Sequence, residues 1–257
     1  MCIRDSAAAV HRVMTALLLG AASRVWVSIP AWESHLRPYA LGRRVPFRWL
    51  PIPATVPAIA DPSGVAAIRD RYVPTQGFLV GHFGTYARHI AEPLLSVLLR
   101  ILRDHGNVSA LLMGRGGESL RDLFIRKHVD LSGRVHATGV LEAAELSRHL
   151  SACDLMIQPY PDGVSSRRTS ATAGLSHSLP IATTTGRLTE PLWEQSAAVA
   201  LAPAGDADAL ADEVERLLAD DDERRRLSKA ARKLYQERFD IKHTIAALRD
   251  GAAGRSD

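Results

Sequence analysis

The pattern of hydrophobic positions becomes regular at about residue 76. Beyond that point, short apolar runs alternate with longer segments in which apolar residues recur at helical spacing. The apolar runs predict strands at 77–84, 108–114, 134–139, 154–160, 179–185 and 197–203. The longer segments predict helices at 88–104, 117–129, 141–152, 206–219 and 221–238, with one more after residue 165. This alternation is typical of βαβ units that bury a parallel sheet.

The segment before residue 76 is less regular. It predicts a helix at 8–21, a strand at 24–29, a short helix at 32–39 and a polar helix at 63–72. Residues 47–59 lie among four prolines, Pro46, Pro51, Pro53 and Pro57. Because proline removes a backbone donor, we expect these residues to stay extended and unpaired.

These patterns divide the chain. We expect a partial second α/β domain at 1–52, a linker and connecting helix at 53–75, the main domain at 76–240, and a C-terminal helix and tail at 241–257. The first part is too small to bury a core of its own. Residues 1–6, MCIRDS, have no pattern that joins them to the neighbouring helix, as expected of a non-native leader on an incomplete reading frame.

Composition narrows the function classes. The chain has 257 residues, 46% of them hydrophobic, and a formal charge of +4 without basic clusters, which argues against a nucleic-acid partner. Cys2 and Cys153 have neither disulfide nor metal-ligand spacing, so we expect no metal site and a reducing, cytoplasmic location. No apolar run is long enough to span a bilayer, and residues 15–23 fit an amphipathic helix better than a signal peptide.

Two glycine-containing loops follow predicted strands. The first, GHFGTYAR at 81–88, has Gly81 and Gly84 on either side of His82. Glycine lets a backbone approach a ligand closely. The second, MGRGGES at 113–119, half-matches a dinucleotide-binding motif, but Ser119 stands where a third small residue belongs. A tight turn between strand and helix explains the second loop equally well.

A third loop, PDGVSSRRTS at 161–170, has an unusual charge pattern. Asp162 and Gly163 suggest a turn, Ser165 or Ser166 a helix N-cap, and the adjacent Arg167 and Arg168 the first helical turn. Cations are mildly unfavourable at a helix N-terminus, whereas free N–H groups and arginines together favour a bound anion. The loop therefore predicts a diphosphate site, and the alternative is a pair of solvated arginines.

From about residue 76 to 245 the chain resembles the C-terminal, donor-binding domain of GT-B glycosyltransferases of group 1. The resemblance rests on the first loop, on LLMGRG at 111–116, on RVHATGVLEAAELSRHLSACDLMIQPYPDGVSSRRTS at 134–170 and on LSHSLPIATT at 175–184. It implies a Rossmann-like sheet with flanking helices, a nucleotide-diphosphate sugar as donor, an unknown acceptor and a role in glycan biosynthesis. It implies no cofactor or metal, is compatible with peripheral membrane association, and makes residues 1–60 the tail of an acceptor-binding domain.

The resemblance also assigns site residues. Those carried over to the donor diphosphate are Gly81, His82, Gly84, Arg88, Ser165, Ser166, Arg167 and Arg168. Those carried over to the sugar or nucleotide are Gly114, Gly116, Gly139, Val140, Asp162 and Gly163. The chain departs from the family pattern at His82, where the family has arginine. It also has Ser165 and Ala173 where the family often carries two glutamates, so the donor and the retaining outcome stay open.

Three alternatives to glycosyl transfer remain. The chain could be a non-catalytic nucleotide-sugar-binding module, or a GT-B epimerase, which needs carboxylates in the cleft and finds only Asp162. An NAD-dependent oxidoreductase would rely on the GRGGES motif alone. No catalytic residue is assigned, and we expect this chain by itself to bind a donor without turnover.

Overall fold

The computed structural model describes residues 3–73 and 77–253. Met1, Cys2, the predicted boundary between linker and main domain at 74–76, and the last four residues of the predicted tail lie outside the described residues. The chain separates into two compact units, one of residues 53–240 and the other of residues 1–52 with 241–257. Each unit is described by itself.

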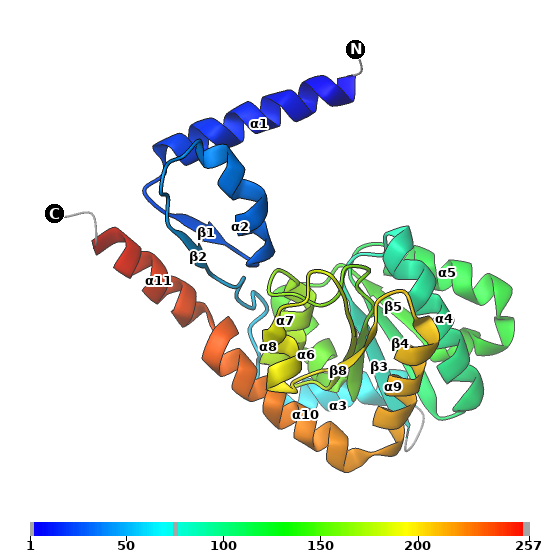
Figure 1. Ribbon diagram of the computed structural model, residues 1–257. Coiled ribbons are helices and arrows are strands. Elements are labelled where there is room, and N and C mark those ends of the chain that lie inside the picture. Colours follow the sequence, from blue (N-terminus) through cyan, green and yellow to red (C-terminus); the bar gives the residue numbers. More distant parts are fainter. Residues whose placement is uncertain (1–2, 74–76, 254–257) are drawn as a thin grey trace. The chain divides into compact units, whose positions relative to one another are not determined.

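A six-stranded sheet forms the centre of the large unit (Figure 1). Its strands are β3 (Phe78–Phe83), β4 (Val108–Met113), β5 (Val135–Gly139), β6 (Leu155–Gln158), β7 (Ile181–Thr185) and β8 (Ala200–Pro203). They lie in the order β5-β4-β3-β6-β7-β8, and every neighbouring pair is parallel. The predicted α/β fold with a parallel sheet is confirmed.

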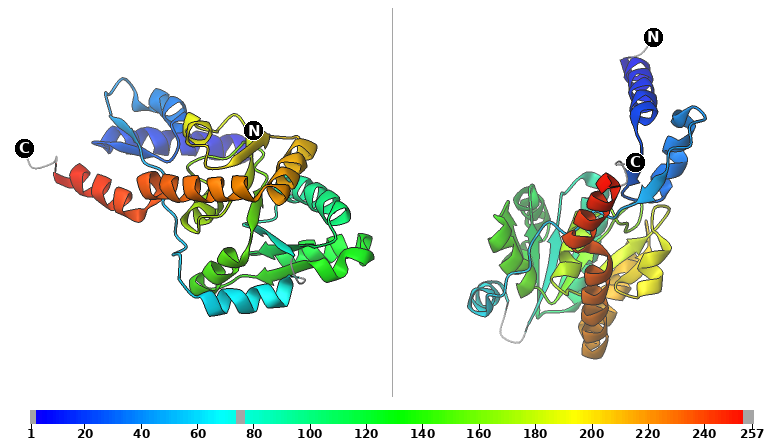
Figure 2. Two further views of the ribbon diagram at one scale, coloured as in Figure 1. Left: turned by 90° about the horizontal axis from the view of Figure 1, so that it is seen from below. Right: turned by 90° about the vertical axis from the view of Figure 1, so that its left-hand side faces the viewer.

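Both faces of this sheet are buried under helices (Figure 2). Successive strand residues enter opposite layers, so that Leu79 and Met156 belong to one core cluster and Val80 and Ile157 to the other. One layer contains α4 (Arg88–Asp104), α5 (Gly117–Lys127) and α9 (Ala207–Ala219). The other contains α3 (Pro62–Tyr72), α6 (Ala143–Ala152), α7 (Thr169–Ser176), α8 (Pro191–Ser196) and most of the buried side chains of α10 (Asp221–Leu234). Two short segments complete the unit, the 3-10 helix η2 (Val129–Arg134) and the π-helical turn η3 (Tyr235–Phe239).

The strand order reverses between β3 and β6. From β3 the chain proceeds through β4 to β5 on one side, and from β6 through β7 to β8 on the other. The loops that leave the carboxyl ends of β3 and β6 therefore diverge. In open α/β sheets this point of divergence is where ligands bind.

The small unit consists of α1 (Ile3–Ala21), β1 (Val25–Val27), α2 (Ala31–Leu36), the 3-10 helix η1 (Arg37–Ala40), β2 (Phe47–Trp49) and α11 (Ile241–Ala253). β1 and β2 pair in parallel, so the prediction that residues 47–59 stay unpaired is wrong for residues 47–49. Pro46 and Pro51 lie outside this short strand, and the carbonyl of Pro46 accepts a hydrogen bond from Val25. Among the described residues, no helix has both the length and the apolar character of a membrane span.

Candidate functional site

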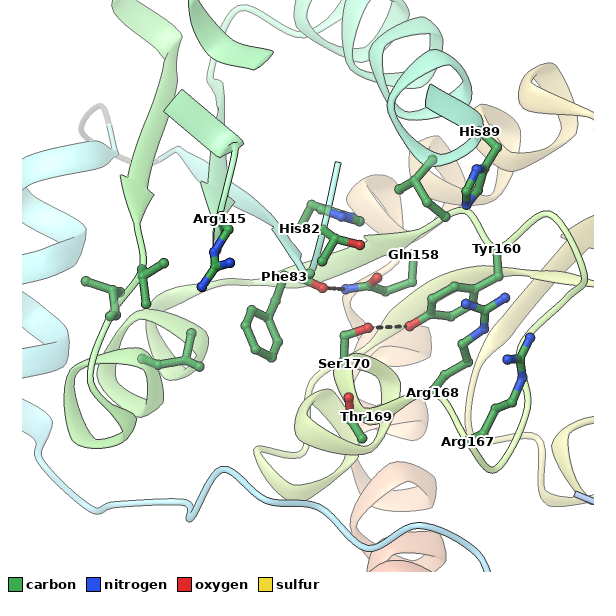
Figure 3. Close-up of a pocket in the computed structure, with 17 residues that line it drawn as sticks. His82, Phe83, His89, Arg115, Gln158, Tyr160, Arg167, Arg168, Thr169 and Ser170 are labelled. Carbon is green, nitrogen blue, oxygen red and sulfur yellow. Dashed lines mark hydrogen bonds between the residues drawn. The ribbon is translucent and has the colours of Figure 1, made fainter. Parts of the chain in front are cut away.

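A cavity of about 640 Å³ lies at the carboxyl ends of β3 and β6 (Figure 3). Its walls come from the loops after β3, β4, β5 and β6 and from the start of α7. The residues that line it are His82, Phe83, Gly84, Thr85, His89, Ile90, Gly114, Arg115, Val140, Leu141, Leu146, Gln158, Tyr160, Arg167, Arg168, Thr169 and Ser170. Arginines are its only fully ionised side chains among these described residues, and no carboxylate is present in the lining.

Two adjacent arginines form one wall of the cavity. The guanidinium of Arg168 lies 4.5 Å from the ring centroid of Tyr160, in a cation–π contact that orients it. Asp162 lies 3.3 Å from Arg167, 3.7 Å from Arg168 and 3.0 Å from Arg187. Three guanidinium groups thus share one carboxylate, and the cluster carries a net positive charge. Burial and the neighbouring Arg167 lower the pKa of Arg168, because both disfavour its charged form.

The loop that leads to α7 differs from the prediction. α7 begins at Thr169 with Arg168 as its N-cap, so the predicted N-cap at Ser165 or Ser166 is wrong. Both serines are fully buried, and the N–H of Ser166 donates to the carboxylate of Glu190 at 3.0 and 3.2 Å. The loop is therefore held by a distant side chain and does not begin the helix itself. The arginines come just before the first turn of α7, and Thr169 and Ser170 of that turn also line the cavity.

Glu190 is the support of this loop, and the sequence analysis missed it. Its side chain is buried with 5% exposure and also accepts a hydrogen bond from Trp193 Nε1 at 2.9 Å. No described cation pairs with it. Since Ser166 and Glu190 are 24 positions apart, no local pattern could have joined them.

The floor of the cavity is polar but uncharged. His82 at the end of β3 has 3% exposure, and its Nδ1 lies 2.8 Å from the carbonyl oxygen of Ile157. Burial lowers the pKa of His82 to about 4, so the ring is neutral at physiological pH. Beside it, Gln158 Nε2 donates to the carbonyl of Phe83 at 3.0 Å, as Figure 3 shows. His82 therefore cannot supply the positive charge of the arginine that it replaces in the family pattern.

The loops of the site are packed against one another. Gly114 has φ +110°, and a Cβ atom there would lie 2.4 Å from the carbonyl oxygen of Gly84. Its N–H donates to the carbonyl oxygen of Gly139, the last residue of β5. At Gly163 (φ +84°), a Cβ atom would lie 2.3 Å from the backbone nitrogen of Gly186. Close approach of the chain to itself explains these glycines.

The remaining predicted residues lie around the cavity or away from it. Gly81 is inside β3, where a Cβ atom would lie 2.6 Å from Cys153 Sγ. Gly116 caps α5 without lining the cavity. The side chain of Arg88 is 88% exposed and pairs with Glu92 at 2.6 Å.

Several lining residues were not singled out in the sequence. Tyr160 and Ser170 join their hydroxyls at 2.7 Å on the arginine side of the cavity. Arg115 lies on the opposite side of the cavity from Arg167 and Arg168 (Figure 3). In the sequence, the signal for Arg115 was its position directly after a predicted strand, between Gly114 and Gly116. Within the part of the chain that the structure describes, no group of three His, Cys, Asp or Glu side chains is placed to hold a metal ion.

Solved structures with the same fold include several glycosyltransferases. Sucrose-phosphate synthase from Thermosynechococcus elongatus superposes with a TM-score of 0.74 at 22% identity, over 96% of this chain and 61% of that one. HepE from Anabaena, solved in complex with UDP, gives 0.77 at 19% identity, over 95% and 67%. The C-terminal domain of LpcC, a group 1 family glycosyl transferase from Francisella tularensis, gives 0.60 at 13% identity, over 74% of this chain and 99% of that domain. The large unit thus has the fold of a GT-B domain, and the chain spans about three fifths of the synthase.

Sequence comparison identifies the family. A comparison with curated proteins gives no match. Residues 77–220, more than half of the chain, match the family described as group 1 glycosyl transferases. The protein therefore belongs to the group 1 glycosyltransferases.

Proposed function

We propose that the cavity binds a nucleoside-diphosphate sugar and that the protein transfers its sugar, a hexose, to an acceptor. The carrying observation is the position of Arg167 and Arg168, which line a cavity without carboxylates at the point where the strand order reverses. Arginine forms bidentate, charge-assisted hydrogen bonds with phosphate. HepE, which shares the fold, has been solved with UDP and with UDP-glucose.

The arrangement suits departure of a nucleoside diphosphate. As the glycosidic bond breaks, negative charge grows on the leaving diphosphate. Guanidinium groups that are already in position stabilise this charge more in the transition state than in the ground state. Because the arginines provide the compensating charge, we propose that no resident metal is needed. Retention of configuration at the transferred carbon stays a prediction.

The rival functions fit the cavity less well. An epimerase requires carboxylate groups beside the sugar, and Asp162, outside the described lining, is already shared among three arginines. The motif that suggested NAD has a packing role, because Gly114 contacts the loop after β3. A non-catalytic binding module would bind the same ligand, so only a measurement of turnover distinguishes it from a transferase.

Two measurements test the proposal. Isothermal titration of this chain with UDP, GDP, ADP and NAD should show one nucleoside diphosphate binding at least about tenfold more tightly than NAD. Incubation of a full-length clone, which adds the acceptor-binding domain expected from the sequence, with the matching sugar nucleotide and an acceptor panel should release the diphosphate and yield a glycosylated product. Tighter binding of NAD would contradict the nucleotide assignment. A changed sugar nucleotide would indicate an epimerase, and binding without release a non-catalytic module.

A further inference from the structure

The cavity floor has two buried acceptor atoms without a protein partner. They are His82 Nε2 at the end of β3 and Gln158 Oε1 at the end of β6, the two strands that flank the reversal of strand order. Both side chains line the cavity, and their exposures are 3% and 0%. A buried polar atom without a partner costs about 1–3 kcal/mol, and such atoms in native proteins call for an explanation.

The hydrogen bonds of His82 fix the role of its free nitrogen. The carbonyl oxygen of Ile157 can only accept, so Nδ1 of His82 must carry the proton of the bond between them. In a neutral imidazole the other nitrogen then has a lone pair and no proton. Nε2 can therefore only accept a hydrogen bond.

Gln158 is fixed by the same reasoning. Its Nε2 donates to the carbonyl oxygen of Phe83 at 3.0 Å. Exchange of its two terminal atoms would put two acceptors against each other, so the orientation with Oε1 free is favoured. The floor thus offers two acceptors and requires donors from a ligand.

The backbone at Gly84 leaves room beside these atoms. A Cβ atom there would lie 3.6 Å from His82 Nε2 and 3.8 Å from Ser170 Oγ. The absence of a side chain at Gly84 therefore keeps a space between the floor and the start of α7. The arginine wall favours anions, whereas the floor favours an uncharged group with several donors.

We propose that His82 Nε2 and Gln158 Oε1 accept hydrogen bonds from hydroxyl groups of the donor's sugar and so select the sugar-bearing nucleotide over the bare diphosphate. The inference rests on the proposed binding of a nucleoside-diphosphate sugar. It makes His82 a specificity-determining residue in place of a phosphate ligand. An uncharged acceptor suits a polyol, since each sugar hydroxyl can donate one hydrogen bond.

Two substitutions at His82 distinguish the role of Nε2, which has no protein partner, from that of Nδ1, which donates to Ile157. The amide nitrogen of His82→Asn can replace Nδ1 in the bond to Ile157, but this variant has no atom at the position of Nε2. His82→Gln places an amide group near the position of Nε2 and serves as the rescue variant. Gln158→Met keeps side-chain length and removes the second acceptor. Thermal unfolding of each variant establishes that it is folded.

The measurement is the ratio of the dissociation constants for UDP and UDP-glucose, with GDP and GDP-mannose, and ADP and ADP-glucose, as further pairs. We expect His82→Asn and Gln158→Met to weaken binding of the sugar nucleotide by about threefold to tenfold. The affinity for the bare diphosphate should change by less than about twofold. His82→Gln should restore most of the ratio. Equal weakening of both ligands, an unchanged ratio, or a folded His82→Gln that behaves like His82→Asn would overturn the inference. Failure of the unaltered chain to bind any of the diphosphates would instead overturn the proposed function and this inference with it.

Discussion

The arginine wall and the floor of the cavity differ in exposure and in charge. Arg167 and Arg168 retain partial exposure, 29% and 21% of their side chains, and both contact the carboxylate of Asp162. His82 and Gln158 are buried and neutral, and each uses one polar atom to bind a neighbouring strand end. Burial excludes charge unless a counterion is present, so the depth of a position decides which chemistry it can offer. One cavity can thus bind an anion at its wall and hydroxyl groups at its floor.

Removal of the arginine wall should have the largest effect. Each charge-assisted hydrogen bond contributes about 1.5–3 kcal/mol, so Arg167→Ala/Arg168→Ala should weaken binding of a nucleoside diphosphate by about 10²- to 10⁴-fold in calorimetric titration. Arg187→Ala is the matched control, because Arg187 also pairs with Asp162 but does not line the cavity. It should change affinity by less than about threefold. Equal effects of the two variants would mean that Arg167 and Arg168 do not bind the diphosphate.

Loss of the support behind the wall should come next. Glu190→Ala leaves the Ser166 N–H and Trp193 Nε1–H without acceptors in a buried place. At about 1–3 kcal/mol for each, the free energy of unfolding should fall by about 2–6 kcal/mol in urea denaturation. Glu190→Gln should cost less, because its carbonyl oxygen still accepts. Glu194→Ala, at an exposed position of the same helix, should cost less than about 0.5 kcal/mol. A neutral result for Glu190→Ala would mean that the loop holds its shape without this carboxylate.

The floor should make the stability of the folded protein depend on pH in the acid range. The pKa of His82 is about 4 in the folded protein, below the ordinary value of 6.5, because burial penalises the charged ring. Below pH 6.5 the unfolded chain gains a proton that the folded protein does not take up, so stability is lost as the pH falls from about 6.5 to 4. The loss from His82 should approach about 3 kcal/mol. His82→Asn should lose correspondingly less stability between pH 7 and 4.5 in urea denaturation. Because the other histidines are common to both proteins, parallel profiles would show that His82 is not held neutral.

The smallest effect is expected at Arg88. Its exposed side chain pairs with Glu92 and does not line the cavity. We expect Arg88→Ala to change the affinity for a nucleoside diphosphate by less than about twofold in the same titration. A loss of tenfold or more would show that Arg88 turns toward the ligand and brings positive charge to the side of the floor.

The sequence was sufficient for the features that local pattern determines. The central strands are predominantly apolar because both of their faces are buried, and each was predicted within a few residues of its observed bounds. Arg167 and Arg168 were noticed because charge at a helix start is unusual. The N-cap was wrong because Glu190, far along the chain, holds the N–H of Ser166.

The chemistry of the floor also could not be predicted from local sequence pattern. His82 was recognised as a departure from the family pattern. Its neutral state, however, depends on burial, and its tautomer on the carbonyl of Ile157, 75 positions away. Gln158 was missed because it looks like the ordinary end of an apolar strand, and only the pairing of β3 with β6 brings Phe83 within its reach. Contacts between strands distant in sequence thus decide the chemistry of the floor.

The contact of Gly114 with the loop after β3 has a consequence for protein engineering. Gly114 leaves no free space beside the carbonyl of Gly84, and it is hydrogen-bonded to Gly139 on its other side. The loops after β3 and β4 and the end of β5 are therefore in contact with one another, and exchange of one of them alone should disturb the other two. A chimera that takes one of them from another glycosyltransferase inherits a mismatch with the other two. Recombination of donor specificity should succeed only when the loops after β3, β4 and β5 are transferred together.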